Sequence, residues 1–141
     1  MNIPRDKHVF LIGNGGSADL CNHVAAEFVG RFLKDRGPLP AVSLCGNPSL
    51  LTAIANDYGY EQVFSRQVEA VVKKNDVLCG ISTSGLSENV MNALRHCYQI
   101  EGKSIAFVGY DSGMMGGWSH LHLCVPSRST PRIQECHLLV W

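Results

Sequence analysis

Five short apolar runs, each followed by a polar loop or an amphipathic stretch, are the feature of this sequence that most limits its fold. The runs are His8–Ile12, Ala41–Cys45, Val77–Ile81, Ser104–Gly109 and Leu121–Val125. Continuous apolar strands that alternate with helices are typical of a parallel sheet covered on both faces. The pattern therefore predicts an α/β fold, a doubly wound, flavodoxin-like domain with a five-stranded parallel sheet flanked by helices.

The stretches between these runs carry apolar residues at helical spacing. The expected helices are Ala18–Leu33, Ser49–Ala55, Gln62–Val72, Ser87–Gln99 and a last helix that begins near Pro131. In the first of them, apolar residues recur at steps of four and predict one buried stripe. The residues of that stripe are Leu20, Val24, Phe28 and Phe32. The fixed φ of Pro131 suits a first helical turn.

Length and charge narrow the class of protein. The chain has 141 residues with 12 basic and 12 acidic side chains and a formal net charge of zero, which fits one domain. A neutral chain without a basic run is a poor ligand for nucleic acid, whose binding depends on clustered Lys and Arg. No apolar stretch approaches the roughly 18 residues of a membrane span. We therefore expect a cytoplasmic domain with neither nucleic acid nor a membrane as partner.

The six cysteines form no Cys-x-x-Cys pair, and most of them stand in apolar segments. They are Cys21, Cys45, Cys79, Cys97, Cys124 and Cys136. We interpret them as buried thiols of a reducing compartment rather than as a zinc knuckle or a nucleophile. Asp76, before the third strand, is interpreted as a solvated charge.

A glycine-rich loop, residues 13–18, follows the first strand and reads Gly-Asn-Gly-Gly-Ser-Ala. In a doubly wound sheet, ligands bind beyond the carboxyl ends of the strands, where helix starts favour anions. This glycine loop loosely fits the dinucleotide fingerprint, but residues 44–47 after the second strand lack the acidic residue that binds a ribose hydroxyl. No Walker lysine follows, which disfavours a nucleotide phosphate cradle.

A hydroxyl-rich loop, residues 82–89, follows the third strand and is here named the serine loop. Its hydroxyl groups belong to Ser82, Thr83, Ser84 and Ser87. Four hydroxyls and a glycine at a helix N-terminus predict an uncharged phosphate site. The alternative is ordinary capping, with Ser87 as the N-cap residue and Ser84 in a turn. Capping needs one hydroxyl rather than four, so we favour phosphate binding.

On the first expected helix, His23 and Glu27 stand four residues apart and therefore on one face. Such a pair can hold a divalent metal or act as acid and base, and the alternative is a solvated pair. By spacing alone, Asn56 and Asp57 mark the end of a helix, and Gln134 is a polar surface residue.

Five blocks of sequence, in order, resemble the SIS (sugar isomerase) domain family and specifically its bacterial phosphoheptose isomerases. The blocks are Gly13–Ser17, His23–Glu27 with Gly30–Phe32, Asn56–Gly59 with Phe64–Arg66, Ser82–Ser87 and Arg132–His137. The resemblance implies an aldose-ketose isomerase that converts sedoheptulose 7-phosphate to D-glycero-D-manno-heptose 7-phosphate for lipopolysaccharide precursors. This chemistry moves a proton between adjacent carbons and needs a base, an acid and an electrophile at the oxygens.

The resemblance also implies a role for particular residues. The sugar contacts implied are Asn14, Gly15, Gly16, Glu27, Asn56, Asp57 and Gln134, and the phosphate contacts are Ser82, Thr83, Ser84 and Ser87. One zinc ion per subunit is implied, with His23, Glu27 and Gln134 as ligands and Glu27 as the catalytic base. His137 is not implied as a ligand.

The resemblance further implies a homo-oligomer, a tetramer in the family. We expect a single SIS domain over residues 1–141 that lacks the family's N-terminal helical segment and the rest of its last helix. By the family's spacing, a histidine that completes the metal site falls just past Trp141. Leu86 replaces the asparagine that is usual in the serine loop.

Two other functions are considered beside the enzyme. One is a non-catalytic SIS protein that binds the bacterial replication initiator, and Glu27 argues against it because those proteins usually lack this glutamate. The other is a sugar-phosphate sensor domain of a regulator. The absence of a DNA-binding segment within the 141 residues counts against that alternative.

Overall fold

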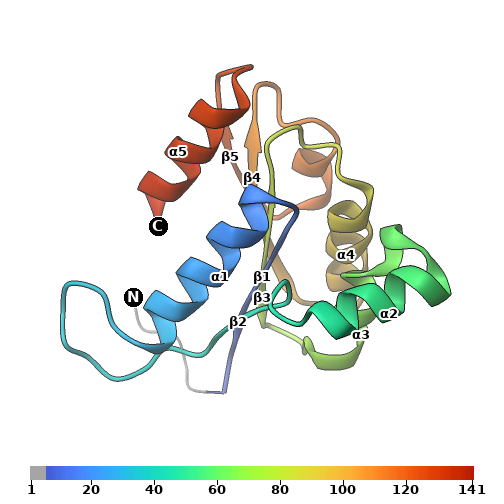
Figure 1. Cartoon of the computed structure of the whole chain (residues 1–141), viewed down its shortest axis with the longest axis horizontal. Coiled ribbons are helices and arrows are strands. Elements are labelled where there is room, and N and C mark those ends of the chain that lie inside the picture. The colour runs from blue at the N-terminus through green and yellow to red at the C-terminus, as the bar shows by residue number, and fades with distance from the viewer. Residues whose placement is uncertain (1–5) are drawn as a thin grey trace.

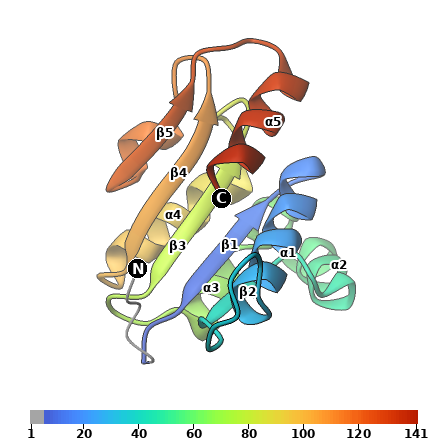
Figure 2. The same cartoon turned by 90° about the vertical axis from the view of Figure 1, so that its left-hand side faces the viewer.

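All five strands run parallel in one sheet, in the order β2-β1-β3-β4-β5 (Figures 1 and 2). The computed structural model describes residues 6–141. The strands are β1 (Val9–Gly13), β2 (Ala41–Ser43), β3 (Val77–Ser82), β4 (Lys103–Gly109) and β5 (Leu121–Val125). Each of the five predicted strands is therefore present, and the predicted doubly wound class is confirmed.

Helices cover both faces of this sheet. They are α1 (Gly16–Val29), α2 (Pro48–Tyr58), α3 (Ser65–Val71), α4 (Glu88–Gln99) and α5 (Thr130–Val140), with short 3-10 turns η1 (Tyr60–Gln62) and η2 (Met115–Trp118). Figure 1 shows α1 and α5 on one face and α2, α3 and α4 on the other. Within residues 6–141, no helix is both long and apolar enough to span a membrane.

Each face of the sheet has its own hydrophobic core because the strands bury side chains on both sides. Under α1, Leu20 and Val24 pack against strand residues such as Leu11 and Ile81. Under α3 and α4, Phe64 and Leu94 belong to the larger cluster on the opposite face. This double burial is why the strands read as continuous apolar runs in the sequence.

The strand order reverses between β1 and β3. The chain leaves β1 through α1 to reach β2 on one side, and then crosses back through α2 and α3 to β3 on the other side of β1. Their register aligns Gly13 with Ile81, one residue before the serine loop begins. In doubly wound sheets, ligands bind at the carboxyl ends of strands at such a reversal. The topology therefore brings the glycine loop and the serine loop to one place.

The first helix is shorter than predicted. It begins at Gly16 and ends at Val29, where the N–H of Gly30 donates to the carbonyl of Ala26. The predicted continuation to Leu33 is wrong, and Phe32 is 66% exposed instead of completing the buried stripe. Glycine at a helix end favours termination because it lowers helix propensity and frees the backbone.

The interpretation of the cysteines as buried thiols holds only in part. Cys136 is exposed and Cys45 and Cys124 are half-buried, whereas the other cysteines are buried as expected. Burial raises the pKa of Cys79 to about 12.

The interpretation of Asp76 as a solvated charge is wrong, because this side chain is 2% exposed. It accepts the backbone N–H groups of His8 and Lys73 at 2.9 and 2.8 Å. Those bonds satisfy the carboxylate in the interior.

Candidate active site

The glycine loop lets α1 start directly at the carboxyl edge of the sheet. A Cβ on Gly13 would lie 2.9 Å from the Cβ of Ser17, so the close approach of strand and helix requires glycine there. Gly15 has φ 53°, a left-handed conformation that also favours glycine. No side chain of residues 6–141 caps this helix start. The N–H groups of Ser17, Ala18 and Asp19 already donate to the carbonyls of Asn14 and Gly15, so the N–H of Gly16 is the first-turn group that an anion could reach.

Three hydroxyls of the serine loop converge. Ser82 is buried, and its Oγ lies 2.8 Å from the Oγ of Ser87 and 3.4 Å from that of Ser84. Thr83, between them in the chain, is half-buried. Ser84 forms the expected turn, since its Oγ accepts the N–H of Leu86 at 3.2 Å. Ser87 takes the N-cap position of α4, but its own side chain makes no capping hydrogen bond to that helix.

The segment before η2 braces the serine loop. The carbonyl of Gly85 accepts the N–H groups of Met114 and Met115, each at 3.1 Å. Gly85 has φ 64°, and any Cβ there would clash with the carbonyl of Ser112. Leu86 points its side chain outward and is exposed. The side chain of Leu86 therefore takes no part in this bracing.

A side-chain network connects the glycine loop to α4 and η1. Asn14 and Asn89 exchange two hydrogen bonds of 2.9 Å, and the hydroxyl of Tyr60 donates to Oδ1 of Asn14 at 2.8 Å. Sequence reasoning singled out Asn14 and missed its two partners. Spacing gives no signal for Asn89, which stands 75 residues from Asn14 and meets it only because β1 and β3 are neighbours.

Asn56 and Asp57 lie in the last turn of α2, as their spacing predicts. Both are exposed, and Nδ2 of Asn56 donates to Oδ1 of Asp57 at 2.8 Å. Across residues 6–141, neither side chain hydrogen-bonds to the glycine loop or to the serine loop. The structure links this segment to the glycine loop through Tyr60 instead.

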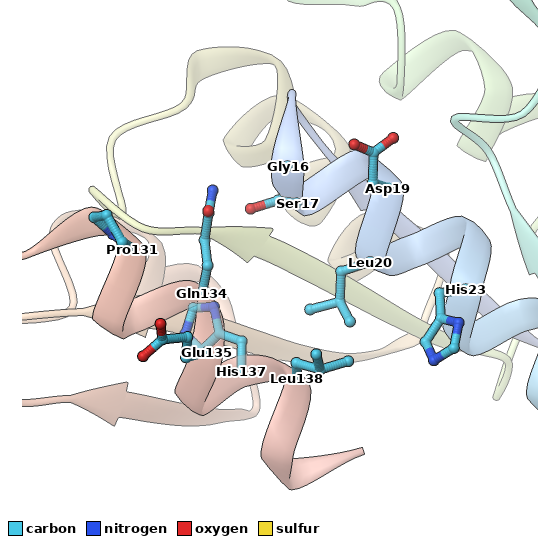
Figure 3. Close-up of a pocket in the computed structure, with 10 residues that line it drawn as sticks. All are labelled: Gly16, Ser17, Asp19, Leu20, His23, Pro131, Gln134, Glu135, His137 and Leu138. Atoms are coloured by element: carbon cyan, nitrogen blue, oxygen red, sulfur yellow. The ribbon is translucent and has the colours of Figure 1, made fainter.

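A cavity of about 520 Å³ separates α1 from α5 (Figure 3). Its lining residues are Gly16, Ser17, Asp19, Leu20 and His23 from α1, and Pro131, Gln134, Glu135, His137 and Leu138 from α5. Figure 3 shows the amide of Gln134 turned toward Gly16 and Ser17, and the ring of His23 at the opposite end. A Cβ on Gly16 would lie 2.7 Å from Nε2 of Gln134, so glycine makes room for this amide.

An adjoining cavity of about 530 Å³ contains both His23 and Glu27 in its lining. His23 thus stands where the two cavities meet. Oε2 of Glu27 is buried and finds no hydrogen-bond partner among the described residues. Beside it, Arg36 donates to the backbone carbonyls of Glu27 and Phe28, both at 2.9 Å. Those carbonyls belong to the last turn of α1, so Arg36 caps the helix.

The predicted zinc ligands meet only in part. His23 and Glu27 fit a metal, because they share one helix face and one cavity and because a buried carboxylate oxygen without a donor suits a cation. Gln134 lines the other cavity with His23, but its amide is turned toward Gly16. In residues 6–141, no cluster of three or more His, Cys, Asp or Glu side chains could hold a metal. A three-ligand set therefore needs Gln134 to turn.

His137 is buried in the contact of α5 with the sheet. Its Nε2 lies 3.1 Å from the carbonyl of Val108, and its ring meets the edge of Phe107. A carbonyl can only accept, so Nε2 carries the proton. Burial lowers the pKa of His137, which keeps the ring neutral. The ring therefore holds α5 against β4, while its Nδ1 is buried and finds no hydrogen-bond partner among the described residues.

Comparison with known proteins places the chain among sugar isomerases. Residues 1–109 match the SIS domain family. The chain is 51% identical over 130 residues to the phosphoheptose isomerase of Aquifex aeolicus and 53% identical over 132 residues to that of Helicobacter pylori. These matches cover 92% and 94% of this chain and 68% and 69% of the relatives.

Solved structures agree with these matches. A phosphoheptose isomerase from Neisseria gonorrhoeae superposes with a TM-score of 0.88 at 43% identity, and one from Francisella tularensis with a TM-score of 0.91 at 36% identity. Each superposition covers 96% of this chain and 72% of the other.

Proposed function

The chain belongs to the SIS domain family and, within it, to the phosphoheptose isomerases, and from this premise we propose that it interconverts sedoheptulose 7-phosphate and D-glycero-D-manno-heptose 7-phosphate. It is an isomerase of the sugar-phosphate class. The observation that carries the specific proposal is that the glycine loop and the serine loop meet at the strand reversal, on the edge where α1 begins. We further propose that the product supplies heptose for lipopolysaccharide precursors, as the family membership suggests.

The serine loop supports the binding of a sugar phosphate. The hydroxyl of Ser82 lies 3.4 Å from that of Ser84 and 2.8 Å from that of Ser87. They surround the start of α4, whose backbone N–H groups attract anions. Hydroxyl and amide donors would hold the phosphate without a lysine or arginine in the loop, which agrees with the neutral composition of the chain.

Glu27 is the base in this proposal. The ketose loses a proton from carbon 1 to a carboxylate oxygen, the electrons form an enediolate, and the proton returns to carbon 2 to give the aldose. The hydroxyl proton on oxygen 1 moves to oxygen 2 in the same conversion. The buried Oε2 of Glu27 supports this role, because it accepts no hydrogen bond from residues 6–141 and keeps a free lone pair.

We also propose that His23, Glu27 and Gln134 hold one zinc ion. When bound, zinc would polarise the oxygens of the reacting carbons. His23 and Glu27 support this assignment by their shared cavity. Gln134 would have to turn its amide from Gly16 toward His23, and the cavity of about 520 Å³ between α1 and α5 leaves space for that rotation.

A homo-oligomer is the assembly that we propose. Its support is the apolar lining of the second cavity, where Phe32 and Leu139 are 66% and 86% exposed. Contiguous exposed apolar residues of this kind mark interaction surfaces. The copies would therefore meet near the ends of α1 and α5, beside Glu27.

Replacing Ser84 by Ala is expected to weaken binding of the phosphorylated sugar while leaving binding of the free sugar unchanged. The lost hydroxyl is one of three that converge in the serine loop, and a hydrogen bond to a charged group is worth enough to lower affinity about tenfold or more. The measurement is the KM for sedoheptulose 7-phosphate beside the inhibition constant of unphosphorylated sedoheptulose.

Ser49→Ala is the matched control, because Ser49 is an exposed serine on α2 that belongs to neither loop. We expect this variant to match the wild-type protein for both sugars. An equal loss of affinity for the phosphorylated and the free sugar in Ser84→Ala would refute the phosphate role.

A further inference from the structure

Asn14 and Asn89 form a reciprocal amide pair between the glycine loop and α4. Nδ2 of each donates to Oδ1 of the other, at 2.9 Å in both directions. Asn89 is 3% exposed, so the pair is shielded from water on that side, whereas Asn14 is half-buried at the mouth of the glycine loop. Tyr60 adds a third bond, from its hydroxyl to Oδ1 of Asn14 at 2.8 Å.

The backbone N–H of Val90 fixes the orientation of the two amides in this pair. Two facing amides can exchange their oxygens and nitrogens and still make two hydrogen bonds, so the pair alone has two orientations. The N–H of Val90 donates to Oδ1 of Asn89 at 2.9 Å, and a backbone N–H can only donate. Oδ1 of Asn89 must therefore face Val90, and this places Nδ2 of Asn14 opposite the same oxygen.

Most hydrogen-bonding groups of the Asn14 carboxamide are then occupied. Its Oδ1 has two lone pairs, which take the donors from Asn89 and Tyr60. Its Nδ2 has two hydrogens, of which one goes to Asn89. One N–H remains, and Asn14 is exposed enough for that group to reach a ligand above the glycine loop.

We propose that Asn89 and Tyr60 are positioning residues that fix the carboxamide of Asn14 so that it offers the bound sugar one N–H donor and no acceptor. This inference rests on the proposed function, since it concerns how that site holds its substrate. The sugar oxygen opposite Asn14 then acts as an acceptor. A donor fixed in advance stabilises negative charge on such an oxygen without reorganising during the reaction.

Tyr60→Phe tests the proposal with little risk to folding, because Tyr60 is 58% exposed and loses only its hydroxyl. We expect kcat/KM for sedoheptulose 7-phosphate to fall about tenfold, the upper end of what one neutral hydrogen bond contributes. Inhibition by inorganic phosphate should stay unchanged, because the serine-loop contacts do not involve Tyr60. Tyr98→Phe is the control, since Tyr98 is 65% exposed on α4 and makes no side-chain hydrogen bond to the described residues.

A double-mutant cycle identifies the residue through which Tyr60 acts. In an Asn14→Ala background, Tyr60→Phe should cause no further loss, because the carboxamide that it holds is gone. A further tenfold loss in that background would overturn the proposal. So would a Tyr60→Phe variant that matches Tyr98→Phe, or one in which phosphate inhibition weakens by the same factor as kcat/KM. Should Asn14→Ala fail to fold, the single variants decide.

The orientation can also be measured without any substrate. In nitrogen-15-labelled protein, the two side-chain amide protons of Asn14 should differ, one protected from exchange by Asn89 and one exchanging freely with water. Two freely exchanging protons would overturn the inference. A wild-type protein that binds phosphate but does not turn over the ketose would contradict the proposed function instead, so the two failures are distinguishable.

Discussion

Glu27→Gln is expected to abolish turnover of sedoheptulose 7-phosphate, with kcat lower by on the order of a thousandfold, as for removal of a general base. Glutamine has the size of glutamate and fits the same cavity beside His23. Its amide cannot accept the proton from carbon 1, so the first step of the proton transfer is lost. Binding of inorganic phosphate should survive, because the serine loop lies at the end of β3 and not on α1. The measurement is kcat for the variant beside its phosphate affinity.

Glu101→Gln is the matched control for this variant. Glu101 is an exposed carboxylate that pairs with Lys74 at 2.6 Å. It lies just before β4, at the amino ends of the strands and therefore opposite the two loops. Removal of a surface charge there should leave kcat unchanged. Wild-type turnover in Glu27→Gln would remove Glu27 from the mechanism. Equal losses in both variants would indicate a general effect of charge rather than a base.

Treatment with a chelator is expected to lower kcat by more than about a hundredfold, and added zinc should restore it. The expectation follows from the several kcal/mol by which a bound metal can stabilise charge on the reacting oxygens. The measurement is activity beside zinc content, before and after dialysis. Full activity in metal-free protein would contradict the zinc assignment.

The assignment of His23 as a zinc ligand is tested separately by substitution. His23→Ala should lose bound zinc together with activity, since His23 shares its cavity with Glu27. His96→Ala is the control, because His96 lies on α4, which covers the other face of the sheet. Retention of zinc by His23→Ala would show that the metal is held elsewhere.

The sheet and its two polar loops could be predicted from sequence because both depend on local pattern. Apolar runs identify strands that are buried on two faces, and the loops after β1 and β3 follow from their glycines and hydroxyls. The limit of local pattern is clear at Gly30. Phe32 continues the four-residue spacing, but the chain leaves the helix at Gly30, and the stripe ends with Phe28.

Contacts between distant parts of the chain could not be predicted in the same way. The pairing of Asn14 with Asn89 depends on the strand order, which no periodicity records. Asp76 looks like a surface charge in the sequence, and it is buried because two backbone N–H groups meet there. The direction of Gln134 likewise depends on the space that Gly16 leaves beside α5.

Conversion of sedoheptulose 7-phosphate by the wild-type protein in D2O tests the central claim most directly. After many turnovers, we expect nuclear magnetic resonance to show the aldose phosphate with deuterium on carbon 2, because a proton held by Glu27 exchanges with solvent between removal and return. Phosphate binding without any aldose product would contradict the isomerase assignment. Aldose that stays free of deuterium at equilibrium would contradict proton transfer through Glu27.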